Sequence, residues 1–323
     1  MASLKDIRRR ISSVKNTQQI TKAMKMVAAA KLRRAQTAIA SAKPFAQKLE
    51  TLAGRIISEI QKGSSLSADK RVEFLKGLHP LLAPPAPKSD VFGEGPKSKV
   101  ALLVVSSDRG LCGAYNTNAV KFAFKRYNEL IADTSVSVSL YFVGRKGYEF
   151  FKKRGLEGHW FSTFWSGKFT TSKSDKVARE LTDHFLSGEF QSIEASFTEF
   201  RSAISQTASN KQILPLSLAA AGISTQGDTQ QAATEENLPF KYEPSREWVL
   251  SEVLPNLVRT QFYRIFADSL ASEFGARMTS MDNASRNAGE MIGSLTLQAN
   301  RVRQASITKE LMEIVGGAEA LKG

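Results

Sequence analysis

The chain has 323 residues, and 42% of them are hydrophobic, which allows a buried core and excludes wholesale disorder. Its formal net charge is +14, from 45 Lys and Arg against 31 Asp and Glu, and this balance predicts an acidic partner such as nucleic acid, an anionic membrane surface or an acidic protein. A single cysteine excludes an internal disulfide framework and a cysteine-based zinc site, and no apolar run approaches the roughly 18–20 residues that span a bilayer.

Residues 1–62 are predicted to form one long helix. The first proline is Pro44, the first glycine is Gly54, and apolar residues recur at alternating steps of three and four. One heptad frame holds for roughly eight heptads, which favours a coiled coil over an ordinary amphipathic helix. The predicted seam contains Leu4, Ile7, Ile11, Val14, Leu32 and Ile39, with Gln18, Thr21 and Lys25 as its only polar entries.

The excess charge is concentrated in this helix. Residues 1–50 contain seven Lys and five Arg against only Asp6 and Glu50. The basic residues are scattered around the helix and the first aromatic residue is Phe45, so nucleic-acid bases would have nothing to stack on. A basic rod inside an acidic or polar protein sleeve fits the pattern equally well, and the residues alone do not separate the two.

Two predicted linkers flank a segment whose sequence pattern differs from that of the long terminal helices. Residues 63–97 hold a cluster of four of the ten prolines at positions 80–87, and residues 222–241 are rich in Gly, Gln, Thr and Ala, so we expect both to be exposed. Between them, residues 98–221 alternate between strand-like and helix-like segments, which predicts a mostly parallel, Rossmann-like α/β domain. The predicted strands are Ser98–Ser107, Val136–Val143, Phe190–Glu199 and Gln212–Leu218, and the predicted helices are Asn116–Leu130, Gly144–Lys153 and Ser174–Leu186.

The turn Ser106–Gly113 is the densest local cluster of chemistry-bearing residues. A cysteine on a tight turn after a strand has the position of a nucleophile in some hydrolases, but no histidine lies in a recognisable setting to activate Cys112. The structural interpretation is that Gly110 and Gly113 allow a tight strand-to-helix turn, with Asp108 capping and Arg109 pairing locally. Neither a phosphate-binding loop nor a dinucleotide-binding motif is present.

Residues 242–323 are predicted to form a second long helix. No proline occurs from Leu257 to Leu321, and Pro255 fits the first turn of a helix. Gly275, Gly289 and Gly293 would permit the close approach of a partner helix. The predicted seam includes Leu295, Val302, Leu311 and Ile314, with a shift of frame after Val302. Two long helices of similar length at opposite ends of a chain can pair antiparallel, which predicts an α/β domain inserted between the two halves of a coiled coil.

Three blocks of sequence resemble a known family, the γ subunit of the rotary F-type ATP synthase, which is the rotor of its central stalk. The first block is Leu4–Gln36, the second is Val104–Asn118, and the third is Tyr242–Pro244 followed by Ser272–Leu321. They occur in the family's order, at both ends and in the middle. The family's fold, a coiled coil of the terminal helices with an α/β domain inserted, agrees with the pattern described above.

The resemblance implies a non-catalytic subunit, with one copy in each complex. Its partners would be the α3β3 hexamer, the epsilon subunit and the membrane c-ring, with no nucleic acid. It would bind no cofactor or metal, because ATP, ADP and Mg are held by the partner α and β subunits. It also implies a peripheral location on the cytoplasmic side of the cell inner membrane, in a bacterial form of the complex.

The resemblance also implies roles for individual residues that lie in motifs shared with the family. Arg303, Gln304 and Thr308 in the run RQASIT would face the catch loops of the β subunits, with Arg277 nearby and Met24 in the other helix at the lower part of the ring. Phe240, Tyr242 and Glu243 would lie near the c-ring and epsilon. Ala299 stands where the family usually has an aromatic residue, so we expect a thinner coil there. The single cysteine excludes the thiol pair of the plastid form.

Overall fold

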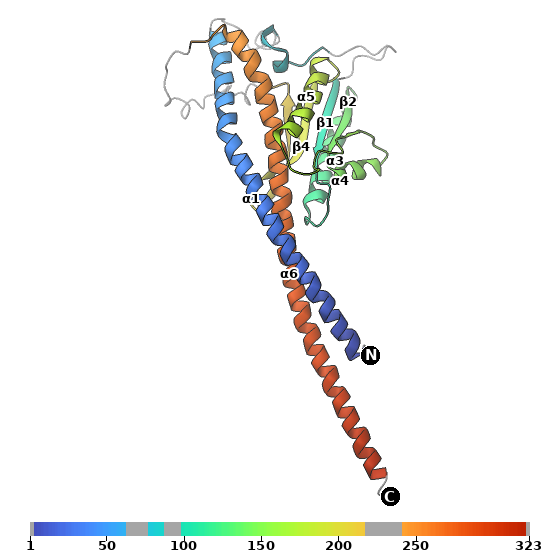
Figure 1. Ribbon diagram of the computed structural model, residues 1–323. Helices are drawn as coiled ribbons and strands as arrows, with labels where there is room; N and C mark the ends of the chain where they lie inside the picture. The colour runs from blue at the N-terminus through green and yellow to red at the C-terminus, as the bar shows by residue number, and fades with distance from the viewer. Residues whose placement is uncertain (1–2, 63–76, 87–97, 217–240, 321–323) are drawn as a thin grey trace.

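The computed structural model describes residues 3–62, 77–86, 98–216 and 241–320. Figure 1 shows two long helices, α1 (Leu4–Lys62) and α6 (Arg246–Ala320), running antiparallel beside each other. An α/β body lies against the part of the pair where α1 ends and α6 begins. The predicted fold class, a terminal two-helix coiled coil with an inserted α/β domain, is confirmed.

Both long helices continue through a proline. Pro44 lies inside α1, and Pro255 lies inside α6 rather than in its first turn, because α6 already begins at Arg246. A proline inside a helix costs about 3 kcal/mol, since one hydrogen bond is lost and the ring crowds the preceding turn. At Pro255 the neighbouring Leu254 and Leu257 are fully buried, and this packing offsets the cost.

The body contains a five-stranded sheet of order β3-β2-β1-β4-β5. All neighbouring strands are parallel except β4 and β5, which are antiparallel. The strands are β1 (Ser98–Val105), β2 (Val136–Val143), β3 (His159–Trp160), β4 (Ser192–Phe200) and β5 (Gln206–Leu214). The two-residue β3 was not predicted, and β5 begins at Gln206 rather than Gln212, because the run QTASNK is polar and gives no strand signal in an edge strand.

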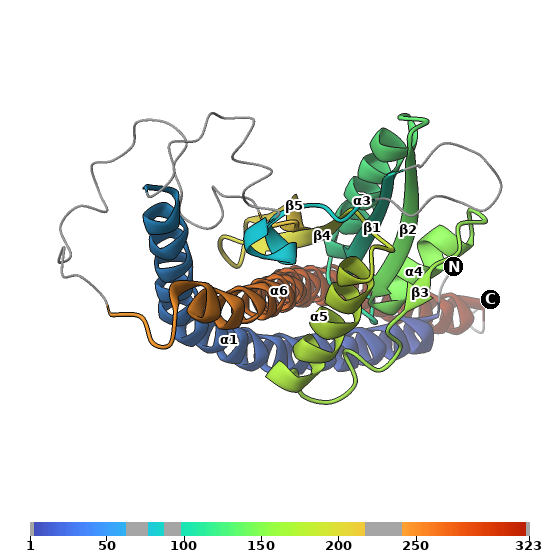
Figure 2. The same ribbon diagram turned by 90° about the horizontal axis from the view of Figure 1, so that it is seen from above.

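Helices cover both faces of the sheet. On one face α3 (Tyr115–Ile131) and α4 (Arg145–Lys152) enclose a small core around Phe142 and Phe151. On the other face α5 (Thr171–Leu186) and the two long helices enclose the main core, which contains Phe185 and Phe266. Figure 2 shows α1, α5 and α6 together on that side. The long helices are therefore part of the domain's own core, and the domain is not a separate body tied on by linkers.

Part of the predicted exposed linker 63–97 is buried. A short 3-10 helix, η1 (Pro80–Leu82), places Leu81 and Leu82 in the main core, and the amide of Leu216 donates a hydrogen bond of 2.8 Å to the Leu81 carbonyl. The expectation of full exposure was wrong here, because the prolines flank the apolar run Leu81–Ala83, whose burial outweighs the local composition.

Candidate functional site

The seam between α1 and α6 is the first part of the site. Ile7, Ala28, Leu32 and Ala35 of α1 are buried, and Leu32 and Ala35 pack against Ala271 of α6. The other predicted positions of α1, Leu4, Ile11, Val14 and Ile39, are half-buried, as are Leu295 and Val302 of α6. Two helices joined along a single seam of this kind make a thin rod.

The three polar positions of the heptad frame form a polar layer across the seam. The Gln18 side-chain amide donates to the Ser285 carbonyl at 3.2 Å, and the Lys25 ammonium lies 2.5 Å from the Asp282 carboxylate. Thr21, which lies between Gln18 and Lys25 in the sequence, is buried. A Cβ at Gly289 would lie 3.1 Å from the Gln18 side-chain nitrogen, so this glycine does permit the close approach expected of it. Polar pairs at fixed positions set the register of the two helices.

The C-terminal part of α6 forms a free tip. The helix has 75 residues against 59 in α1, and Figure 1 shows it running well past the N-terminal end of α1. Leu311 and Ile314, which the sequence places in the seam, are instead 57% and 69% exposed, because α1 does not reach their level. Ile307, Met312 and Val315 are also exposed. The tip therefore presents apolar side chains that nothing in the described chain covers.

The structure separates the expected stator-facing residues into two levels. Arg303, Gln304 and Thr308 are exposed on the tip. Met24 is half-buried on α1 beside the exposed Met26. Arg277 and Arg303 are 26 positions apart, which corresponds to about 39 Å of helix, so Arg277 lies at a lower level of α6 than the tip residues.

Arg277 is also not a free cation. Its guanidinium lies 2.5 Å from the Glu273 carboxylate, and its other terminal nitrogen donates to the Gly110 carbonyl at 3.1 Å. The side chains of Arg277 and Glu273 are only 12% and 10% exposed. Burial raises the pKa of Glu273, and the positive charge of Arg277 opposes that rise. Sequence reasoning missed Glu273, although its position four residues before Arg277 is the spacing of a helical ion pair.

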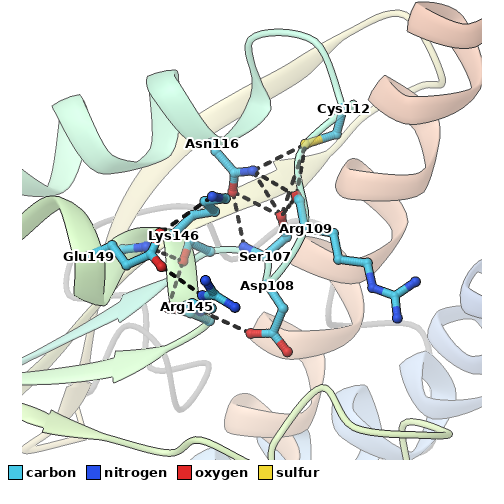
Figure 3. A network of polar contacts seen from close by, with 11 residues as sticks. Ser107, Asp108, Arg109, Cys112, Asn116, Arg145, Lys146 and Glu149 are labelled. Carbon is cyan, nitrogen blue, oxygen red and sulfur yellow. Dashed lines mark hydrogen bonds and ion pairs between the residues drawn. The ribbon is translucent and has the colours of Figure 1, made fainter.

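The turn after β1 is a closed polar network, shown in Figure 3. Three successive backbone amides at the start of α4 donate to the turn. The Arg145 amide donates to the Asp108 carboxylate at 2.9 Å, and the Lys146 amide donates to the Ser107 carbonyl at 3.0 Å. The Gly147 amide donates to the Ser106 hydroxyl at 2.8 Å. In open α/β sheets, ligands bind at this end of the strands. Here the chain's own oxygens already occupy the first amides of α4, so the turn has a structural role.

Cys112 lies inside this network and is not a nucleophile. It is 1% exposed, and the Asn116 side-chain amide donates to its sulfur at 3.2 Å. Burial raises the pKa of the thiol, which disfavours the reactive thiolate. Asp108 accepts from the first amide of α4 and does not cap α3, the helix that follows the turn and has no side-chain cap. Arg109 contributes its carbonyl, and its side chain points away from the network. Gly113 has the expected left-handed conformation, whereas the second such position is Leu111 and not Gly110.

The start of α6 forms the base of the rod. Tyr242 is half-buried against the main core, and the Arg246 guanidinium lies 5.6 Å from the centre of its ring. Arg246 also pairs with Glu59 of α1 at 3.5 Å, which joins the two helices at this end. Glu243 is exposed and pairs with Lys241 at 2.6 Å. Phe240, the third residue expected in this region, lies outside the described residues.

Within the described ranges, no group of three or more His, Cys, Asp or Glu side chains is arranged to hold a metal ion. No helix in the same part of the chain is both long and apolar enough to cross a membrane.

Known proteins resemble this chain over its whole length. The family model described as ATP synthase matches residues 3–321. ATP synthase gamma chains of Anaeromyxobacter sp. (strain K) and Geotalea uraniireducens are 45% and 41% identical, each alignment covering 100% of both chains.

Solved structures show the same fold at low sequence identity. A chain of the Euglena gracilis mitochondrial ATP synthase, from a structure of its OSCP, F1 and c-ring, is 16% identical with a TM-score of 0.57 and covers 98% of this chain and 94% of its own. A chain from the central stalk and c-ring of the Tetrahymena thermophila mitochondrial ATP synthase is 19% identical with a TM-score of 0.50, covering 82% of this chain and 99% of its own.

Proposed function

The chain belongs to the ATP synthase gamma chain family, and we infer from this membership that it is the central-stalk rotor of the F1 sector. It is a non-catalytic subunit that couples rotation of the c-ring to ATP synthesis, and ATP hydrolysis to ion pumping. This conclusion depends on the sequence identity of 41% and 45% to two bacterial gamma chains, in alignments that cover the full length of both chains.

The coupling follows from asymmetry. The β subunits of an α3β3 hexamer are chemically identical, whereas two helices of unequal length have no symmetry about their common axis. Each β subunit therefore contacts a different face of the rod and is held in a different conformation. To move one β subunit from 1:99 to 99:1 between two states, contacts with the rod must differ by about 5.5 kcal/mol. Rotation of the rod passes this difference from one β subunit to the next.

We propose two levels of contact between rod and stator. The upper level is the tip, where Arg303, Gln304 and Thr308 would face the β catch loops and the exposed apolar residues would turn inside the hexamer. The lower level is the part of α1 around the half-buried Met24, where the neighbouring Met26 and Val27 are exposed. The net charge of +14 supports transient attraction to acidic loops of the stator.

The base of the rod is proposed as the foot of the rotor. Tyr242 and Glu243 lie where both long helices meet the α/β body, and with Phe240 they would face epsilon and the c-ring loops. The division of the chain into residues 1–62, 98–221 and 242–323 as shaft, body and shaft belongs to this proposal. One copy would be present in each complex, peripheral to the cell inner membrane on its cytoplasmic side. ATP, ADP and Mg would bind to the α and β subunits, and nucleic acid is not a partner in this proposal.

Purification of the native complex through a tag on this chain tests the proposal. We expect a large membrane-associated assembly with ATPase activity, containing α, β, epsilon and c subunits and no nucleic acid. Salt-sensitive binding of DNA by the chain, together with the absence of those subunits, would overturn it in favour of a basic coiled-coil nucleic-acid-binding protein.

A further inference from the structure

We propose that Arg277 is a positioning residue that fixes the turn Ser106–Gly113 of the α/β body to the shaft, so that the body and α6 rotate as one. This inference rests on the proposed rotor function and assigns Arg277 a role different from contact with the stator. It concerns a joint, defined here as the segment Ser269–Ser280 of α6 together with the turn 106–113 and residues 198–203 at the end of β4.

The joint is a series of polar contacts on one side of α6. The Ser272 hydroxyl donates to the Thr198 carbonyl at 3.2 Å, and the Thr279 hydroxyl donates to the Ala203 carbonyl at 3.1 Å. The Thr198 amide in turn donates to the Ser269 hydroxyl at 3.5 Å. In each contact α6 meets the main chain of the body, and main-chain groups do not change rotamer under load.

A close approach of the backbones reinforces these contacts. A Cβ at Gly275 would lie 3.3 Å from the Ala203 Cα and 3.4 Å from the Ala203 carbonyl oxygen, which is tighter than ordinary contact. The sequence suggested that this glycine admits a partner helix, but the neighbour is the loop after β4. The end of β4 is therefore pressed directly against the shaft.

Arg277 extends the joint to the turn after β1. Ser272 and Thr279 contact β4 and the loop after it, and Ser269 also contacts Tyr115 at the start of α3. The guanidinium of Arg277 reaches the turn itself, where it donates to the Gly110 carbonyl at 3.1 Å. The ion pair with Glu273 holds the guanidinium in place, and the Arg277 side chain is only 12% exposed although Gly110 lies at the surface. The positive charge strengthens the hydrogen bond to the Gly110 carbonyl. One planar side chain thus ties the strand-to-helix turn at the centre of the sheet to α6.

The mechanical role of the Arg277–Gly110 hydrogen bond follows from its position along α6. Toward the base, the body and both helices share one hydrophobic core. Toward the tip, the rod is two thin helices and then α6 alone. Torque that enters through the body must pass into α6 at or before the joint, and a turn that slipped against α6 would waste part of each rotation as elastic twist.

Replacement of Arg277 in the complete ATP synthase tests the proposal. Arg277→Lys keeps a cation beside Glu273 but lacks the fork that also reaches Gly110, and Arg277→Met removes both contacts. We expect both variants to enter the complex and to pump fewer protons for each ATP hydrolysed, with the larger loss in Arg277→Met. Absence of the chain from any ATP synthase would contradict the proposed function, whereas an assembled variant with normal proton-to-ATP coupling would contradict the joint.

Arg286→Met is the matched control. Arg286 also lies on α6 and pairs with an acid four residues earlier, Asp282, at 3.8 Å. Its side chain is 69% exposed, and both Asp282 and its other partner, Asn283, belong to α6. We expect normal coupling in this control. A loss equal to that of Arg277→Met would show that any arginine on this helix matters, and would overturn a specific role in the joint.

A disulfide across the joint separates a mechanical role from a merely structural one. A Cβ at Gly113 would lie 3.9 Å from the Ser280 Cβ, within the usual span of a disulfide. The triple variant Gly113→Cys, Ser280→Cys and Cys112→Ala is made once with Arg277 kept and once with Arg277→Met. The first form shows whether the left-handed position 113 tolerates cysteine. In the second form, oxidation should restore proton-to-ATP coupling, and reduction should remove that gain again. A closed disulfide that leaves coupling low would overturn the proposal.

Discussion

The base and the tip of α6 belong to one continuous helix but have opposite surroundings. At the base, Leu250, Phe262 and Phe266 are fully buried in a core that they share with the sheet. At the tip, Leu311 and Ile314 are exposed. The chain therefore stabilises the base by its own packing and leaves the apolar side chains of the tip exposed.

Phe266→Ala removes a side chain from the centre of the base. Phe266 lies 4.4 Å from Phe164, measured between ring centres, and is fully buried. We expect the free energy of unfolding of the chain to fall by about 3–5 kcal/mol, because the apolar contacts are lost and a cavity remains. Urea denaturation of the purified chain measures this, and a loss below about 1 kcal/mol would mean that α6 is not part of the domain core.

Leu32→Ala tests the seam between base and tip. Leu32 is buried against Ala271, but the seam is thin and can partly close around a smaller side chain. We expect a loss of about 2–3 kcal/mol in the same measurement. A matched change at the exposed Val27 to Ala should have almost no effect, and equal losses at the two positions would argue against the seam.

Asp268→Asn tests a charge buried at the base. Burial raises the pKa of Asp268 from 3.8 to about 6, and the neighbouring Glu199 adds to the rise while Arg264 and Lys211 oppose it. The folded chain thus binds this proton more tightly than the unfolded chain. The stability contribution of this group therefore increases as pH falls from about 7 through 6 towards 4.

The neutral Asn removes this dependence and should stabilise the chain at pH 7.5 by about 2 kcal/mol. Unfolding curves for both chains at pH 5 and pH 7.5 measure the difference. Parallel pH profiles for the two chains would contradict the assignment.

Leu311→Ala and Ile314→Ala at the tip should change the unfolding free energy of the isolated chain by less than about 0.5 kcal/mol each, because exposed side chains lose little contact. In the assembled complex the same changes should weaken the fit of the tip, which ATPase measurements at rising temperature would detect. A large loss of stability in the isolated chain would mean that the tip folds back onto a partner surface of its own chain.

Heptad spacing predicted the seam well where both helices are present, at Ile7 and Leu32, because periodicity records which face of a helix is apolar. It placed Leu311 and Ile314 in the same seam, because periodicity does not record which partner covers that face. Composition marked residues 63–97 as exposed, yet Leu81 is buried by contacts with distant parts of the chain. Local patterns carry no information on such contacts.

The candidate site shows the same limit. The motif that contains Arg277 is recognisable in the sequence, but its hydrogen bond to Gly110 joins residues 167 positions apart. The edge strand β5 was predicted too short, because it is polar on its exposed positions. Fold class and helix faces are therefore accessible from the sequence, whereas the contacts that hold Arg277 require the three-dimensional arrangement.

If this chain turns inside its complex, a rotation assay will show it. The α3β3 part of the complex is fixed to a surface, and a probe is attached to a cysteine introduced at the exposed Lys153 in a Cys112→Ala background. On addition of ATP, we expect rotation in one direction, with one pause for each β subunit in every turn. A probe that stays stationary while the same molecules hydrolyse ATP would contradict a rotor function.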